Sequence, residues 1–257
     1  MLDLIIKNGQ CYIDGELKNV DVAIKDGKIH QIGEISEKAK EEISAKGLTV
    51  LPGCIDTQTH FREPGSTDTE DLHSGSRAAI AGGITSVFEM PNTNPPTSNK
   101  VEFQKKLDLA KNRMYCNYAF YFGATANNVN QLSDLKDLEG CCGIKLFVGS
   151  STGNLLVAEE ADIEKVFQSS SKVVAVHSED EAILKVNKKL IKTGDVHTHP
   201  IWRSVECAMS STRRRTSYPA VSRIFPFKVP SNPRKASGGT PWPSGLKGTA
   251  RSSTLNL

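Results

Sequence analysis

Apolar and polar residues alternate along residues 2–35, with interruptions at Asp14-Gly15 and Asp26-Gly27. Alternation with a period of two is typical of strands that bury one face. Asp-Gly between two such segments favours a tight hairpin turn. The pattern therefore predicts a small antiparallel β unit at the start of the chain.

A different pattern begins near residue 48, where short apolar runs alternate with segments of helical periodicity. The runs predict strands at 48–56, 84–90, 116–124, 141–149 and 172–178. Between them, the spacing of apolar residues predicts amphipathic helices within 98–113, 161–168 and 181–191. Such alternation implies a parallel sheet with right-handed crossovers, either doubly wound or a (β/α)8 barrel. No GxGxxG motif follows the first strand, which weighs against a dinucleotide-binding fold.

Polar side chains gather where these strands end. They are Asp56, Gln58, His60 and Arg62 after the first strand, Asn92 after the second, and His177, Glu179 and Asp180 at the fifth. Barrel enzymes carry their active sites at the carboxyl ends of the strands. Lys145 lies inside the fourth apolar strand, where a charge is costly unless it is paired or neutralised. A barrel fold would therefore bring these residues to one site.

Composition narrows the class of protein. The chain of 257 residues is 38% apolar and 24% charged, as is usual for a globular protein. No apolar run approaches the ~18 residues of a membrane span, and the N-terminus lacks the pattern of a signal peptide. The six cysteines show no CxxC spacing. We therefore expect a cytoplasmic protein with reduced cysteines and no membrane contact.

The charge is unevenly distributed. Residues 207–257 contain nine Lys and Arg residues and no acid, whereas all 29 acids lie in residues 1–206. This segment is also rich in serine and proline. A basic tail can bind nucleic acid, but the composition favours a disordered segment that cannot bury a core. Nucleic-acid binding is the least favoured of the functions considered.

Four segments, in this order and spacing, resemble the amidohydrolase superfamily, and within it the dihydroorotases of the cyclic-amidohydrolase type. They are PGCIDTQTHFREPG (52–65), EMPNTNPP (89–96), GIKLFVGSSTG (143–153) and AVHSEDE (175–181). The resemblance covers residues 1 to about 214. It implies an α/β fold with an incomplete (β/α)8 TIM-type barrel at 48–214, of about strands 1–5. The N-terminal part of a small β-sandwich would precede it at 1–47, and the basic tail would follow at 215–257.

The resemblance also implies roles for single residues. His60 and His177 match metal-binding histidines, and Lys145 matches a lysine that is carboxylated and bridges two metals. One or two zinc ions are implied. Arg62 and Asn92 match residues that hold the substrate carboxylate. Gln58 stands where the family has the first histidine of an HxH pair, and an amide binds zinc less well than imidazole, so a mononuclear enzyme or a pseudoenzyme is an open alternative.

The implied reaction is reversible hydrolysis of dihydroorotate to N-carbamoyl-aspartate in pyrimidine biosynthesis, by attack of metal-bound hydroxide. No catalytic residue can be named, because the family's strand-8 aspartate, its proton shuttle, is not found, nor is its strand-6 histidine. The strand–helix rhythm stops after Arg214, which suggests truncation by a frameshift near codon 213. We expect the parent form to be a homo-oligomer, and we expect little or no turnover by this chain alone.

Two other functions stay open beside a dihydroorotase. One is an allantoinase-type or hydantoinase-type hydrolase, although these usually lack the arginine that matches Arg62. The other is a non-catalytic dihydroorotase-like subunit that supports aspartate transcarbamoylase, for which Gln58 is some evidence.

Several polar residues have ordinary structural interpretations. We expect His30 and His73 to be structural, and His197 and His199 to lie on the surface of a loop. Asp56 is expected to orient the first strand, and Lys145 could instead extend to the barrel rim. Arg62 could pair with Glu63 or Asp56, which is the less favoured outcome.

Overall fold

The computed structural model describes residues 1–149 and 154–218. The chain divides into two units, Met1–Thr212 and Arg213–Leu257. Most of the basic tail, and the end of the GIKLFVGSSTG motif, lie outside the described residues. The disordered tail therefore stays a prediction.

Seven short strands form two small sheets in the first 50 residues. One sheet has the order β5-β4-β1-β6 and the other β3-β2-β7. The strands are β1 (Leu2–Lys7), β2 (Gln10–Ile13), β3 (Glu16–Asn19), β4 (Asp21–Lys25), β5 (Lys28–Gly33), β6 (Ala39–Ser44) and β7 (Thr49–Val50). Leu2, Ile5 and Ala23 form the buried core of the first sheet. Whether the two sheets make a sandwich stays a prediction.

Both predicted hairpins are present. The pairs β2–β3 and β4–β5 are antiparallel, and the Asp-Gly turns between them have positive φ at Asp14, Gly15, Asp26 and Gly27, as a type I′ turn requires. The pair β1–β4 is antiparallel as well, so the antiparallel unit predicted for residues 2–35 is confirmed. Two later strands, β6 and β7, pair parallel to β1 and β2. These two strands lie beyond the alternating segment and return beside its first strands.

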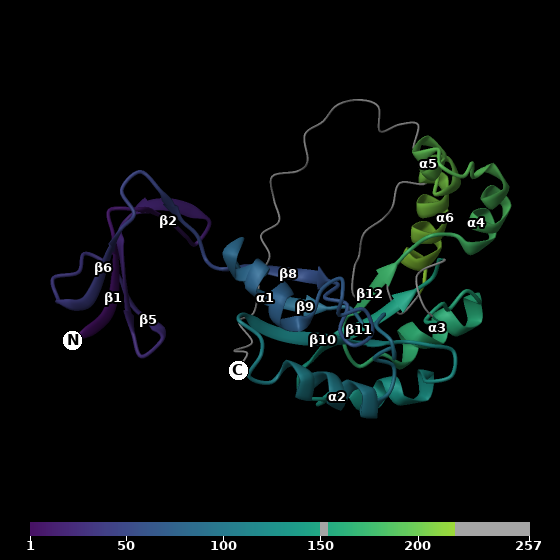
Figure 1. Ribbon diagram of the computed structural model, residues 1–257, viewed down its shortest axis with the longest axis horizontal. Helices are drawn as coiled ribbons and strands as arrows, with labels where there is room; N and C mark the ends of the chain where they lie inside the picture. The colour runs from purple at the N-terminus through teal and green to yellow at the C-terminus, as the bar shows by residue number, and fades with distance from the viewer. Residues whose placement is uncertain (150–153, 219–257) are drawn as a thin grey trace. The chain divides into compact units, whose positions relative to one another are not determined.

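Five parallel strands form the main sheet, in the order β12-β11-β10-β9-β8 (Figure 1). They are β8 (Cys54–Thr59), β9 (Ile84–Glu89), β10 (Asn117–Gly123), β11 (Cys141–Phe147) and β12 (Val174–His177). Helices α1 (Leu72–Ala81), α2 (Lys100–Ala110) and α3 (Glu160–Ser169) and the 3-10 segment η1 (Val129–Leu135) connect them. The predicted α/β fold is confirmed, and this sheet of consecutive parallel strands is a half-barrel.

The remaining helical segments follow β12. They are α4 (Glu181–Asn187), η2 (Lys188–Leu190), η3 (Val196–Thr198), α5 (His199–Trp202) and α6 (Val205–Thr216). The helix predicted for residues 181–191 is therefore α-helical only over Glu181–Asn187 and continues as the 3-10 segment η2. Asp180 begins α4 by accepting hydrogen bonds from the Ala182 and Ile183 amides.

The first predicted strand is divided in two. Thr49–Val50 pairs with β2, and Cys54–Thr59 pairs with β9. The apolar run from 48 to 56 hid this division, because Pro52 and Gly53 interrupt the pairing without interrupting the hydrophobicity.

The two edge strands of the half-barrel differ from its centre in burial. Phe120, Phe122, Ile144 and Leu146 of β10 and β11 are completely buried. Ile55 on edge strand β8 is 58% exposed, because no further strand or helix of the described chain covers it. The expectation that the first and fifth strands are open edges is therefore met within the described residues.

Candidate functional site

His60 and Asn92 meet at the carboxyl ends of β8 and β9. His60 directly follows β8 and is half-buried, and its side chain is hydrogen-bonded to Asn92. Burial lowers the pKa of His60, and the positive charges of Arg62 and Lys145 lower it further, against the opposing effect of Asn92. The imidazole is therefore neutral at pH 7, which is the form that binds a metal ion.

Arg62 lies in the loop that leaves β8. Its φ is 60°, in the left-handed region that non-glycine residues seldom occupy. Its neighbours Phe61 and Glu63 are both buried, whereas Arg62 is exposed. Within the described residues it forms no ion pair with Glu63 or Asp56, because Glu63 pairs with Arg113 and Asp56 accepts a hydrogen bond from the Gln58 amide. Arg62 is thus available to an external anion.

Lys145 is a buried amine in the middle of β11. Its side chain is 2% exposed, so the alternative that it extends to the barrel rim is wrong. Burial lowers its pKa to about 8. Its Nζ lies 5.0 Å from the centre of the Phe147 ring, and within the described residues no carboxylate forms an ion pair with it. A buried amine with a lowered pKa is more often neutral, and hence more nucleophilic, than an ordinary lysine.

His177 ends β12, beside the strand that carries Lys145. It is paired in register with Phe147, and the two rings lie 6.2 Å apart. Its Nε2 lies 2.5 Å from Glu179 Oε2, and Glu179 also pairs with Arg203. A carboxylate on one ring nitrogen fixes the orientation of the imidazole. Phe147 contacts both predicted site residues, Lys145 on its own strand and His177 on the next.

A buried ion pair joins the end of β9 to α2. Glu89 and Lys106 are each 1% exposed and form an ion pair. Lys106 also donates a hydrogen bond of 3.1 Å to the Met90 carbonyl. Sequence reasoning missed this pair, although Lys106 lies three residues after Phe103 and four before Ala110, on the apolar face of the helix.

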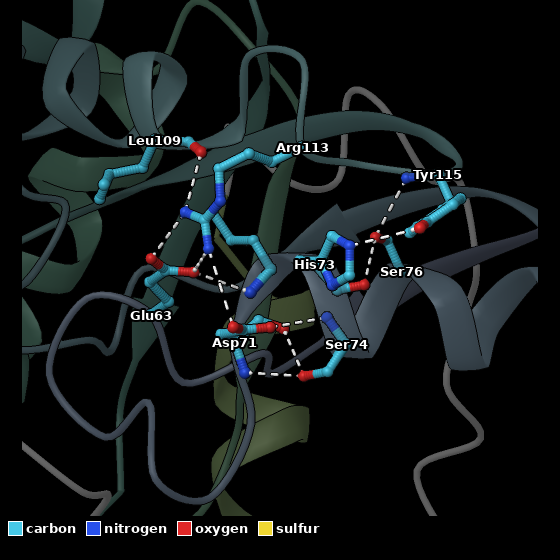
Figure 2. Close-up of polar contacts among 9 residues, drawn as sticks. Glu63, Asp71, His73, Ser74, Ser76, Leu109, Arg113 and Tyr115 are labelled. Atoms are coloured by element: carbon cyan, nitrogen blue, oxygen red, sulfur yellow. Dashed lines mark hydrogen bonds and ion pairs between the residues drawn. The ribbon is translucent and has the colours of Figure 1, made fainter.

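A second polar network, also missed, lies beside Arg62. Figure 2 shows the Glu63 carboxylate facing the Arg113 guanidinium, with Asp71 close to the same arginine. Asp71 begins α1 as a capping box with Ser74. Nothing in the local pattern indicates that Arg113 reaches back fifty positions to Glu63.

The other histidines behave as expected for structural or surface residues. His73 on α1 lies 3.3 Å from the Tyr115 hydroxyl, with the two rings edge to face (Figure 2). His30, His197 and His199 are exposed. The expected loop position of the last two is wrong, because His197 lies in η3 and His199 begins α5. Gln58 is also exposed, near the end of β8.

The residue types at this end of the sheet fit a metal ion in part. The imidazoles of His60 and His177 and a buried amine without an acidic partner in the described chain are the donors that a zinc ion with a carboxylated lysine would use. No group of three or more His, Cys, Asp and Glu side chains suited to a metal occurs in the described residues. A site here would therefore need Lys145 as a ligand.

The five parallel strands, with polar residues at their carboxyl ends, define an α/β protein of the half-barrel class. The Amidohydrolase family model matches residues 49–202. The chain belongs to the amidohydrolase family.

Curated relatives include both dihydroorotases and allantoinases. The chain is 37% identical over 201 residues to the dihydroorotase of Methanosarcina mazei, covering 76% of this chain and 43% of that protein. It is 34% identical over 220 residues to an allantoinase of Escherichia coli, covering 79% and 48%. The chain thus spans less than half the length of these relatives.

Among solved structures, the L-hydantoinase (dihydropyrimidinase) from Arthrobacter aurescens is similar, with a TM-score of 0.78 and 26% identity. The match covers 87% of this chain and 51% of that one. Among the described residues, none of the helices has the length and apolar character needed to cross a membrane.

Proposed function

We propose that the chain forms the first half of the active site of a dihydroorotase-type cyclic amidohydrolase. The observation that carries the proposal is the meeting of His60 and Asn92, joined by a hydrogen bond, with Arg62 close enough to lower the pKa of His60. An imidazole, an amide and a guanidinium at one strand end suit a substrate that carries both a cyclic amide and a carboxylate.

In this proposal Arg62 and Asn92 bind and orient the carboxylate, and Arg62 is the specificity determinant. Dihydroorotate carries that carboxylate, whereas hydantoins need not. His60, His177 and a carboxylated Lys145 would hold one or two zinc ions. When bound, the metal supplies Lewis-acid activation of the amide and of water. The product would be N-carbamoyl-aspartate.

The lowered pKa of Lys145 supports its proposed role. Formation of a lysine carbamate requires a neutral amine, and burial lowers the pKa of Lys145 to about 8. The carbamate would be an anion stabilised by cations, so it would remove the cost of burying an ammonium.

Zinc binding and ligand binding together test the proposal on the full chain. We expect bound zinc by elemental analysis, and binding of dihydroorotate that is lost in Arg62→Ala. Binding of allantoin or hydantoin but not of dihydroorotate would contradict the assignment of substrate. We expect turnover to be very low even where binding is measurable, because the chain spans under half of the enzymes it matches.

Gln58 favours a second candidate function, a non-catalytic subunit that supports aspartate transcarbamoylase. An amide at this exposed position is a weaker zinc ligand than the expected histidine. Absence of zinc, together with retained binding to aspartate transcarbamoylase, would favour this function over the first.

A further inference from the structure

The loop that carries Arg62 is fixed by one buried carboxylate. Glu63 Oε1 lies 2.8 Å from Arg113 Nη1, and its Oε2 lies 3.2 Å from Arg113 Nη2. The same Oε2 accepts a hydrogen bond of 2.8 Å from the amide of Leu72, the first residue of α1. Arg113 also donates to the Leu109 carbonyl at the end of α2 (Figure 2). Glu63 therefore ties the loop to two helices at once.

The geometry of this contact makes it a strong one. Arginine and carboxylate form a two-bond fork that fixes both planes, which a single hydrogen bond cannot do. The hydrogen bond that Arg113 donates to Glu63 raises the pKa of Arg113 above its usual value, so the guanidinium stays charged. The Glu63 carboxylate is buried, whereas the Arg113 side chain is 36% exposed, so solvent reaches the pair only from the arginine side.

The residue on the other side of Arg62 is also fixed. Phe61 is buried and packs against Gly75 of α1, where an added Cβ would lie 2.4 Å from the Phe61 ring. Arg62 is thus held between two anchored neighbours, and its φ of 60° is the conformation that they impose. A sparsely populated backbone conformation persists only when its surroundings determine it.

We propose that Arg113 is a positioning residue that, through Glu63, holds Arg62 in the orientation needed to bind the carboxylate of an anionic cyclic amide. This inference rests on the proposed function, because it assigns Arg62 to the substrate carboxylate. Release of Glu63 lets Arg62 relax to negative φ, which turns its side chain away from Asn92 and His60. Arg113 acts on specificity without touching the ligand.

The experiment compares an anionic and a neutral ligand on the full zinc-loaded chain. Calorimetry measures binding of dihydroorotate and of dihydrouracil, which lacks the carboxylate, to the wild type, Arg113→Ala, Arg113→Lys and Lys105→Ala. Lys105→Ala is the matched control, because it removes an exposed ion pair from α2, the helix that ends three residues before Arg113. We expect Arg113→Ala to weaken dihydroorotate binding about tenfold or more, as loss of a charged clamp does, and to leave dihydrouracil binding unchanged.

Two further variants separate positioning from a structural role. Arg113→Lys keeps the charge but loses the two-bond contact with Glu63, so we expect it to bind dihydroorotate more weakly than the wild type and more tightly than Arg113→Ala. In an Arg62→Ala background, Arg113→Ala should add no further loss of dihydroorotate binding. Equal weakening of both ligands by Arg113→Ala, or a further loss in the Arg62→Ala background, would overturn the proposal.

If the wild type binds neither ligand, the proposed function is contradicted, but the positioning role of Arg113 can still be tested by hydrogen exchange. Arg113→Ala should speed exchange of the amides of residues 61–63 and of Leu72 by about tenfold, while Lys105→Ala leaves them unchanged. Unchanged exchange of these amides in Arg113→Ala would overturn the positioning role.

Discussion

The buried pair of Glu89 and Lys106 gives a stability prediction whose sign depends on pH. Burial raises the pKa of Glu89 from 4.5 to about 7, although Lys106 opposes the rise. The folded state therefore holds this proton more tightly than the unfolded state. Stability from this carboxyl is fully present below about pH 4.5 and is lost as the pH rises through about 7.

Lys106→Met removes the group that opposes the rise in pKa. The pKa of Glu89 should then increase further, so the folded variant keeps the carboxyl neutral. Near pH 5 the variant loses mainly the hydrogen bond to the Met90 carbonyl, which is about 1 kcal/mol. Near pH 8 the unfolded Glu89 is ionised and the folded one must keep a proton. The wild type already carries the cost of the rise from 4.5 to about 7, so at pH 8 a further rise adds at most about one pKa unit, which is about 1.4 kcal/mol.

Urea unfolding followed by far-ultraviolet circular dichroism measures the effect near pH 5 and near pH 8. We expect Lys106→Met to cost about 1 kcal/mol at the lower pH and about 2–3 kcal/mol at the higher pH. The double variant Glu89→Gln/Lys106→Met should recover stability to within about 1–2 kcal/mol and lose the pH dependence. Lys105→Met, on the exposed face of the same helix, is the control. An equal cost at both pH values would refute the reasoning.

Three further substitutions test other parts of the structure. Lys145→Met should stabilise the zinc-free chain at pH 7 by up to about 3 kcal/mol, measured as a higher melting temperature. The free-energy cost of burying the Lys145 ammonium is full below its folded pKa of about 8 and disappears above the unfolded value of 10.5, so destabilisation by the substitution would contradict this. Gly75→Ala should cost about 1–3 kcal/mol through its clash with Phe61, whereas Gly82→Ala, whose nearest neighbour is at 3.5 Å, should be close to neutral in the same urea assay. Gln58→His should raise zinc affinity about tenfold or more in a chelator competition, and unchanged affinity would place residue 58 away from the metal.

The order and type of the main elements could be predicted because their signals are local. Apolar runs at 84–90, 116–124 and 141–149 became β9, β10 and β11, which have neighbours on both sides. Because the carboxyl ends of parallel strands meet at one edge of the sheet, His60 and Asn92 could be expected to lie close together. The structure joins their side chains by a hydrogen bond. The division between β7 and β8 was missed because hydrophobicity continues across a break in pairing.

The supporting contacts could not be predicted, because each joins residues far apart in sequence. Glu63 and Arg113 are fifty positions apart. Lys106 on the apolar face of α2 is a local anomaly that marks a buried charge, but the helical pattern does not name Glu89 as its partner. Partner identity depends on how helices cross the sheet, which periodicity does not encode.

The supporting contacts also explain which part of the site is best determined. Around β8 and β9, Glu63 with Arg113 and Glu89 with Lys106 bind the strand ends to α1 and α2, within consecutive strand–helix units. These contacts need no strand beyond β10, so the orientation of Arg62 and Asn92 does not depend on closing a barrel. His177 lies instead on an edge strand whose four residues are all only half-buried. Its ring is held by Glu179, which in turn pairs with Arg203. The first two strand–helix units therefore suffice to hold Arg62 and Asn92 for the proposed recognition of a carboxylate, whereas the position of His177 depends more on what covers β12.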